Sequence, residues 1–196
     1  MDVRNEVLPR AFYERPVTDV ARDLLGRHLV VVRDRRRVGG RIVETEAYGG
    51  PGDPGSHADR APGGRARIMF GRPGIAYVYF TYGMHHCVNA VTGPAGEASA
   101  VLIRALEPRW GTDAMRAGAP DTLREHHLTS GPGRLCRALR IDRELYGADL
   151  VRGPLRILAG EPASEVCRGL RVGLSRDDGR AWRFWTPSPS VSARRN

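Results

Sequence analysis

The chain contains no lysine: all 31 of its Lys and Arg residues are Arg, set against 22 acidic residues for a formal net charge of +9. A positive excess favours a polyanionic partner, because a cationic surface releases counterions from a phosphate backbone. The use of Arg alone also fits a biased nucleotide composition of the source genome. Without Lys there is no P-loop for nucleotide hydrolysis, and no GxSxG elbow of a serine hydrolase occurs either.

Cysteine is scarce, with Cys87, Cys136 and Cys167 far apart and no Cys-x-x-Cys pair. This spacing argues against a disulfide framework or a zinc knuckle, and we expect buried thiols. The histidine doublets 85–86 and 126–127 make poor bidentate ligands, because adjacent side chains diverge on a strand or a helix. No HExxH pattern accompanies them, so we expect neither a metal nor a cofactor.

Long apolar runs are also missing. A run such as 29–32 is far too short to cross a bilayer, and no apolar stretch follows the charged residues at the start of the sequence. We therefore expect no membrane partner, no secretory signal and a cytoplasmic location, associated with the nucleoid if the source is bacterial.

Apolar periodicity predicts a single α+β domain over residues 1–196, with strands too closely spaced for many βαβ crossovers and hence a largely antiparallel sheet. The Gly- and Pro-rich stretch 49–74 lacks periodicity and is expected to be a long functional loop. The tail 187–196 is expected to be frayed. The predicted helices are 18–25, 110–117 and 132–139, and the predicted strands are 28–32, 41–48, 75–82, 85–91, 98–106, 155–158, 170–174 and 182–186, with a polar turn at 34–37.

Two acids stand on one face of the predicted strand 41–48, because Glu44 and Glu46 are two residues apart. Such a face is most often exposed to solvent. Tyr48 follows on the same face and leads into the long loop, however, and an acid, an aromatic ring and a loop together can form a recessed catalytic site.

Tyrosines are concentrated in one strand. Tyr77 and Tyr79 alternate onto one face, where Tyr77 is expected to fill the core, and the Tyr82-Gly83 turn is expected to expose the Tyr82 ring. In a basic protein, exposed aromatics also indicate stacking on bases or a wedge into DNA. His57, in the Gly/Pro-rich loop, is expected at the surface unless the fold places it opposite Glu46.

These residues together resemble the alkyladenine (3-methyladenine) DNA glycosylase family. The similarity keeps the order of the family's motifs from about residue 20 to residue 190. It is carried by the segments 41–48, 73–74, 77–79, 82–84, 101–108, 130–132, 135–136, 171–173 and 183–184, together with Cys87 and Asn89.

The resemblance implies a curved antiparallel sheet flanked by helices, with a protruding hairpin that bears Tyr82. It also implies a monomeric hydrolase of base excision repair, which flips an alkylated or deaminated purine out of double-stranded DNA and releases it. The carried-over roles are a general base (Glu46), two groups that hold its water (Arg104 and the Val172 carbonyl), residues around the flipped base (Tyr48, His57, Tyr79 and Asn89) and residues at the DNA surface (Tyr82 and Met84). Glu44 is expected to support Glu46.

Without Lys, strand cleavage through a Schiff base is not expected, so the predicted product is an intact abasic site. The sequence does not rank 3-methyladenine, 7-methylguanine, hypoxanthine and ethenoadenine as substrates. It leaves open a damage-binding module without hydrolysis, a metal-dependent hydrolase built on the histidine doublets, and acyl or formyl transfer to a tRNA.

Overall fold

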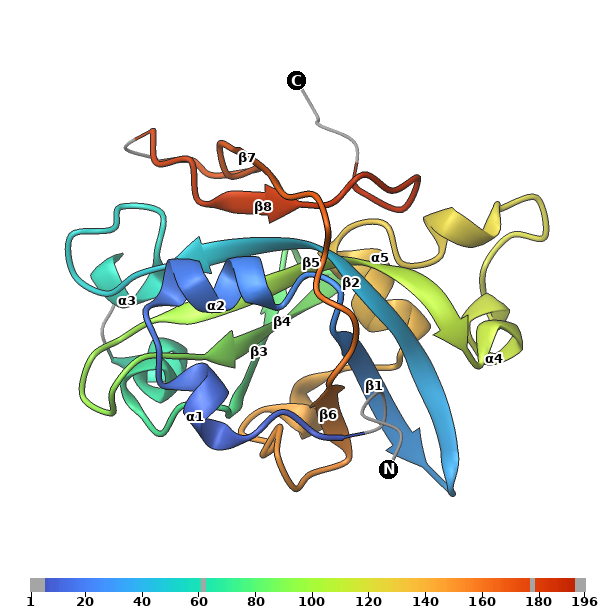
Figure 1. The fold of residues 1–196 in the computed structure, drawn as a ribbon, viewed down its shortest axis with the longest axis horizontal. Helices are drawn as coiled ribbons and strands as arrows, with labels where there is room; N and C mark the ends of the chain where they lie inside the picture. Colours follow the sequence, from blue (N-terminus) through green and yellow to red (C-terminus); the bar gives the residue numbers. More distant parts are fainter. Residues whose placement is uncertain (1–5, 61–62, 177–178, 193–196) are drawn as a thin grey trace.

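A curled antiparallel sheet runs through the protein and carries helices on both sides (Figure 1). The computed structural model describes residues 6–60, 63–176 and 179–192. The main path of the sheet has the order β3-β4-β5-β2-β1-β6, and β8 pairs with both β2 and β7. The strands are β1 (His28–Arg33), β2 (Arg36–Tyr48), β3 (Ala76–Thr81), β4 (His85–Val91), β5 (Ala100–Trp110), β6 (Leu155–Leu158), β7 (Cys167–Gly169) and β8 (Arg183–Trp185).

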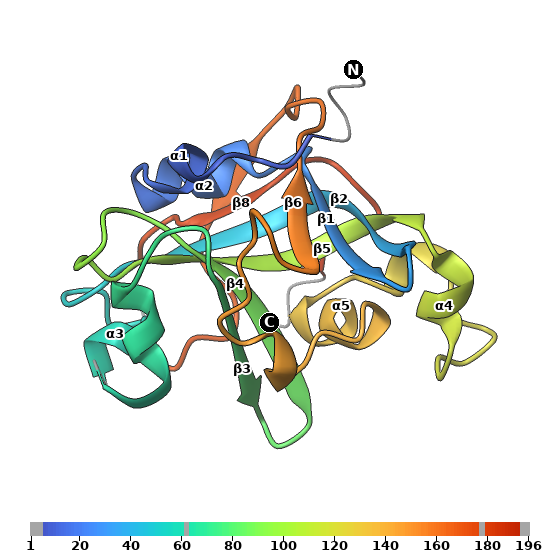
Figure 2. The same cartoon turned by 90° about the horizontal axis from the view of Figure 1, so that it is seen from below.

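The helices are short and lie around this sheet. In the view of Figure 2, α1 and α2 lie on one side of it and α5 on the other, while the β3–β4 hairpin protrudes from the body. The α-helices are α1 (Arg10–Tyr13), α2 (Val17–Asp23), α3 (His57–Arg60), α4 (Thr112–Arg116) and α5 (Pro132–Ala138), and the 3-10 helices are η2 (Gly64–Phe70), η3 (Glu125–His127) and η4 (Arg143–Leu145).

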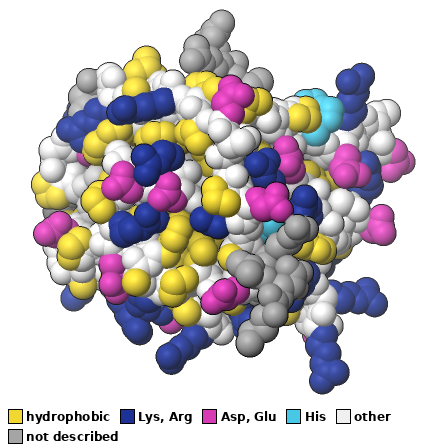
Figure 3. Space-filling view, in the orientation of Figure 1, with side chains coloured by type: hydrophobic (Ala, Val, Ile, Leu, Met, Phe, Trp, Pro, Cys, Tyr) yellow, Lys and Arg dark blue, Asp and Glu magenta, His cyan; other side chains and the backbone are white. Residues whose placement is uncertain are grey.

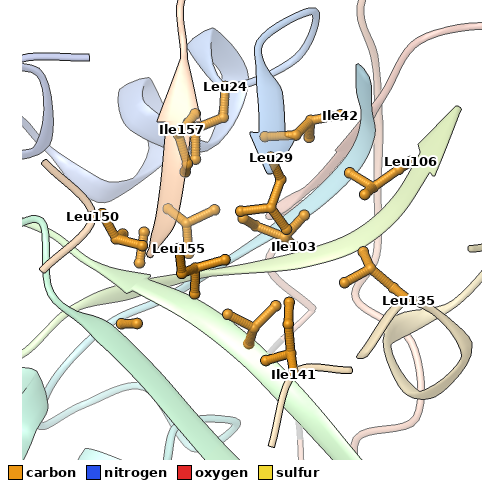
Figure 4. Packing of buried hydrophobic residues seen from close by; sticks show 14 of the residues in the cluster. Leu24, Leu29, Ile42, Ile103, Leu106, Leu135, Ile141, Leu150, Leu155 and Ile157 are labelled. Atoms are coloured by element: carbon orange, nitrogen blue, oxygen red, sulfur yellow. The ribbon is translucent and has the colours of Figure 1, made fainter. Parts of the chain in front are cut away.

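The hydrophobic core is assembled from elements distant in sequence (Figure 4). Leu24 at the end of α2, Leu29 of β1 and Ile42 of β2 are fully buried, and they join apolar side chains of β5, β6 and α5. Thr45 Oγ1 donates a 2.7 Å hydrogen bond to the Ala21 carbonyl, which ties α2 to β2. This packing holds the centre of β2 in place.

The predicted fold class is confirmed, because the chain forms a single α+β domain with a curved antiparallel sheet. The polar turn is shorter than predicted. Asp34 and Arg35 have φ values of 48° and 62°, which are typical of a two-residue hairpin turn, and β2 starts directly at Arg36. Strand β5 extends to Trp110, which pairs with Gly39, so the predicted helix 110–117 is reduced to α4.

Three predictions about the course of the chain are wrong. The stretch 49–74 is not structureless, because it contains α3 and η2. Residues 170–174 form no strand: the strand lies at β7, and the segment after it leaves the sheet because Arg171 pairs with Asp53. The tail is not frayed at 187–192, since Ser190 and Ser192 are buried and the N–H of Ser192 donates to Glu44. Residues 193–196 lie outside the described ranges.

Candidate active site

The acidic part of β2 lies in the middle of the sheet. Residues 44–46 pair with β5 on one edge and with β8 on the other. Strands on both edges exclude water, and Glu44 and Glu46 are both fully buried. Of the two interpretations of this acidic face, exposure to solvent is therefore wrong.

Two register shifts bring Arg104 to these acids. In the β2–β5 pairing, Ile42 faces Leu106 and Glu44 faces Ala105, whereas the next residue of β2, Thr45, faces Ile103. One residue on each strand is thus left out of register, Val43 on β2 and Arg104 on β5. Irregularities of this kind redirect side chains, and Arg104 extends to both carboxylates.

Glu46 accepts hydrogen bonds from three residues. Its Oε2 accepts from the Tyr48 hydroxyl at 2.7 Å and from Arg104 Nη1 at 3.1 Å, while its Oε1 accepts from the Val172 N–H at 2.7 Å. A carboxylate offers about four acceptor positions. Among the contacts of the described residues, the remaining acceptor capacity therefore lies on Oε1.

Burial dominates the electrostatics of this carboxylate. Burial raises the pKa of Glu46 above its ordinary value, against the opposing effects of Arg104, the Tyr48 hydroxyl and the Val172 N–H. The pKa of Arg104 is lowered by burial but raised overall by Glu46 and Glu44. Arg104 therefore stays charged, and Glu46 is a stronger base than an exposed Glu.

A cavity of about 610 Å³ is lined by the three donors to Glu46, namely Tyr48, Arg104 and Val172, and by several further aromatic rings. Tyr48, His57 and Tyr79 all contribute to its wall. The His57 ring meets Tyr79 edge to face with 4.7 Å between centroids, and His57 Nδ1 shares a 2.9 Å hydrogen bond with the Tyr77 hydroxyl. Burial raises the pKa of both Tyr48 and Tyr79. The Glu46 charge raises the pKa of Tyr48 further, and the Cys87 thiol does so for Tyr79, so both rings stay neutral.

Asn89 and Val172 complete the polar part of the wall. Asn89 is buried on β4, lines the cavity and donates from Nδ2 to the Tyr77 carbonyl at 2.9 Å. Val172 also lines the cavity, and its N–H contacts Glu46. The resemblance predicted a role for the Val172 carbonyl; the contact found here is made by the N–H, and the role of the carbonyl stays a prediction.

The β3–β4 hairpin presents exposed apolar side chains beside the cavity mouth. Tyr82 is 78% exposed and Met84 is 70% exposed, and Tyr82 borders the cavity. Tyr82 has a φ of 51°, a left-handed conformation that non-glycine residues adopt rarely, and it stands in the turn between β3 and β4. The predicted exposure of Tyr82 is confirmed, as is the burial of Tyr77.

Sequence reasoning missed a buried ion pair that holds the loop after β2. Arg171 Nη1 and Nη2 donate to the two carboxylate oxygens of Asp53 at 2.8 Å each, and Nη1 also contacts the Ala47 carbonyl at 3.2 Å. The Arg171 guanidinium lies 5.0 Å from the centroid of the Tyr48 ring. The pair thereby positions both Tyr48 and the neighbouring Val172. The only sequence signal for it was the segment 171–173, one of those that carry the family resemblance.

The histidine doublets do not form a metal site in the described part of the chain. No group of three or more His, Cys, Asp or Glu side chains suited to a metal ion occurs there. Cys87 and Cys136 are buried as predicted, whereas Cys167 is partly exposed. Within the described ranges, no helix has the length and apolarity needed to cross a bilayer.

Charged side chains of both signs are interspersed on the face shown in Figure 3. Arg side chains there lie next to Asp and Glu side chains and alternate with apolar ones. The net positive charge of the chain is therefore not gathered into a single-sign patch on this face.

A buried carboxylate held by three residues of a cavity wall is typical of an enzyme active site. The family model of methylpurine-DNA glycosylase (MPG) matches residues 11–190. The chain belongs to this family and is a DNA glycosylase.

Curated relatives agree over nearly their full length. A protein of Streptomyces avermitilis named "Putative 3-methyladenine DNA glycosylase" is 48% identical over 94% of this chain and 90% of its own. A protein of Methanocella arvoryzae with the same name is 47% identical over 96% of both chains. A third, from Carboxydothermus hydrogenoformans, is 47% identical over 91% of this chain and 94% of its own.

The Asp53–Arg171 pair yields a stability prediction. In Asp53→Asn, Arg171 loses the carboxylate that accepts from both of its Nη atoms, and we expect the free energy of unfolding to fall by about 1.5–3 kcal/mol at neutral pH, the scale of a hydrogen bond to a charged group. Urea denaturation measures this loss. Asp121→Asn, at an exposed position, serves as the control and should change stability by less than about 0.5 kcal/mol.

The same pair gives this stability a pH dependence. Burial raises the pKa of Asp53, but hydrogen bonds from Arg171, Gly49 and Gly55 outweigh it and lower the pKa below its ordinary value. The contribution of the pair is then complete above the unfolded-state pKa of about 4 and is lost as the pH falls through the lower folded-state pKa. Asp53→Asn should lack this acid-dependent loss, and a loss equal to that of the wild type would contradict the assignment.

Proposed function

We propose that the protein is a monofunctional DNA glycosylase that hydrolyses the N-glycosidic bond of a flipped alkylated or deaminated purine. The substrates would belong to the class of 3-methyladenine, 7-methylguanine, hypoxanthine and ethenoadenine, and the product would be an intact abasic site in double-stranded DNA. The observation that carries the proposal is the Glu46 carboxylate, which is held by three donors beside the aromatic cavity and keeps acceptor capacity on Oε1. The names of the relatives support the first of these substrates.

In this mechanism the cavity holds the flipped base by stacking. Tyr48 and Tyr79 are neutral rings, and His57 lies edge-on against Tyr79. An alkylated purine carries positive charge, and a cation over a tyrosine ring gains about 0.5–2 kcal/mol. Asn89, buried in the cavity wall, would stand against the 2-amino group of an unmodified guanine.

Glu46 would act as the general base. Its raised pKa increases its affinity for a proton, and its negative charge stabilises the cation that develops on the sugar. Water bound at Oε1 would lose its proton to Glu46, and its oxygen would form the bond to the sugar carbon as the bond to the purine breaks and its electron pair passes to the purine. A cationic purine would leave as a neutral base, whereas a neutral purine such as hypoxanthine would take up a proton as it leaves. Arg104 and the Val172 carbonyl would help hold this water.

The β3–β4 hairpin would maintain the flipped state. Extruding a base costs a few kcal/mol and leaves a gap in the stack, which an aromatic wedge can fill. Tyr82 is exposed at the hairpin tip and borders the cavity mouth, so it would fill the gap while Met84 contacts the adjacent DNA surface.

Glu46→Gln tests the base. The variant cannot accept the proton, so we expect single-turnover excision of hypoxanthine or 3-methyladenine to slow by at least about 100-fold while DNA affinity is retained. For the wild type, we expect the rate to fall as the pH drops through the raised pKa of Glu46, because protonation removes the base.

The control for this substitution is Glu97→Gln, at an exposed position, which should excise at the normal rate. Normal excision by Glu46→Gln would contradict the role of Glu46. Tight binding of damaged DNA by the wild type without release of any base would instead favour a damage-binding module.

Tyr82→Ser tests the wedge. Loss of the ring removes one stacking contact, so we expect binding of lesion-containing duplex to weaken by about 1–3 kcal/mol. The fluorescence of 2-aminopurine placed beside the lesion reports the flipped population, which should fall. Val166→Ser, at another exposed apolar position, should leave both readouts unchanged.

Borohydride trapping tests the monofunctional reaction. A glycosylase that also cuts the strand forms a Schiff base through a primary amine, and no side chain here supplies one because the chain lacks Lys. We expect no covalent enzyme–DNA adduct under conditions in which a lysine-dependent glycosylase is trapped on the same DNA. Any trapped adduct would overturn this part of the proposal.

A further inference from the structure

Glu44 is a fully buried acid that the proposed reaction does not use. Its Oε1 accepts from Arg104 Nε at 3.0 Å, from Arg183 Nε at 2.7 Å and from the Ser192 hydroxyl at 2.9 Å. Its Oε2 accepts from the Ser192 N–H at 2.8 Å. The acid is thus held on both oxygens by two guanidinium groups and by the segment after β8.

The guanidinium of Arg104 in turn makes one contact from each of its three nitrogens. Its Nε donates to Glu44, its Nη1 donates to Glu46 Oε2 at 3.1 Å, and its Nη2 lies 3.3 Å from the Ser192 hydroxyl. Because the guanidinium is planar and rigid, three directed contacts leave it a single orientation. In that orientation it offers Glu46 only one amino group.

Ser192 is brought to the site by Arg183. Arg183 Nη2 donates to the Ser192 carbonyl at 3.3 Å, and Arg183 itself is buried on β8. Together Glu44, Glu46, Arg104 and Arg183 form a buried cluster of two negative and two positive charges, which we call the four-charge cluster. Ser192 supplies the uncharged hydrogen bonds that complete it.

The single contact between Arg104 and Glu46 has a chemical consequence. Arginine and carboxylate pairs commonly form two parallel hydrogen bonds. A paired geometry here would place a second donor on Glu46 Oε1, which already accepts from the Val172 N–H. It would fill the acceptor position that a water needs.

We propose that Glu44 and Ser192 are positioning residues for base excision: they occupy Nε and Nη2 of Arg104 and so keep it from pairing with Glu46 through two amino groups. This inference rests on the proposed function, in which Glu46 activates water. It assigns a task to the C-terminal segment, which lies 148 positions from Glu44 along the chain.

The proposal has a pH signature. If the Ser192 hydroxyl is removed, Arg104 turns toward Glu46 and favours its ionised form, so the pKa of Glu46 falls. The acid limb of the rate profile then moves to lower pH. Removal of the Glu44 charge also lowers this pKa directly, because Glu44 is one of the groups that raise it, so the acid limb of Ser192→Ala is the decisive measurement. The groups that bear on Glu46 are Arg104, Glu44, the hydroxyls of Tyr48 and Tyr79, the Cys87 thiol and the Val172 N–H.

The experiment compares the wild type with Glu44→Gln and Ser192→Ala. Single-turnover excision from a hypoxanthine-containing duplex is followed from acid to neutral pH, together with DNA affinity and thermal unfolding. We expect each variant to lower the plateau rate by about tenfold, the scale of one hydrogen bond to a charged group. We also expect an acid limb at lower pH and unchanged DNA affinity.

Ser188→Ala is the matched control. Its hydroxyl lies in the same segment and accepts from the Ser190 N–H, so rate and acid limb should stay as in the wild type. Wild-type plateaus and acid limbs in the variants would overturn the inference. The inference would also be overturned if the rate of a variant fell only in proportion to its loss of folded protein while the acid limb of its pH profile stayed at the wild-type pH. Ser192→Ala keeps the test decisive if Glu44→Gln does not fold. Failure of the wild type to excise any base would instead overturn the proposed function.

Discussion

The structure depends on the burial of two carboxylates in the middle of a β-sheet. Removing an acid from water costs several kcal/mol unless charges and hydrogen bonds compensate it. Here Arg104 and Arg183 supply the charges, and Ser192, Tyr48 and the Val172 N–H supply the remaining contacts. The site is therefore stable only when four parts of the chain are folded around β2, namely β5, β8, the segment after β7 and the segment after β8. Formation of the site thus depends on formation of the whole sheet.

Local backbone geometry makes this compensation possible. If β2 and β5 were paired without interruption, Arg104 would face a residue of β2 directly. The register shifts around Glu44 place Arg104 between the pairs Glu44–Ala105 and Thr45–Ile103 instead, within reach of both acids. The register shifts remove backbone hydrogen bonds between β2 and β5, but they place the Arg104 guanidinium between the two carboxylates.

The sequence predicted those features that depend on near neighbours. Alternating apolar residues indicated the central strands, and the Tyr82-Gly83 pair indicated a turn that exposes Tyr82. The burial of Glu44 could not be predicted in this way, because it depends on β8 and Ser192, more than 130 residues further along. Alternation at 170–174 was misleading, since the Arg171 contact with Asp53, 118 positions away, outweighs local β propensity. The family resemblance placed Glu46 and Arg104 in one site because it carries such long-range information.

A chain whose only strongly basic side chain is Arg constrains the chemistry of its site. A guanidinium stays protonated at any physiological pH, is directional and does not act as a nucleophile, whereas a buried Lys readily loses its proton and attacks carbonyl carbon. Arg104 can therefore lie beside Glu46 as a permanent charge without being a nucleophile itself. The permanent charge of Arg104 also has an unfavourable effect, because it lowers the pKa of Glu46 and so weakens Glu46 as a base. Burial of Glu46 raises its pKa against this effect. The contacts of Arg104 with Glu44 and Ser192 limit Glu46 to a single hydrogen bond from the guanidinium.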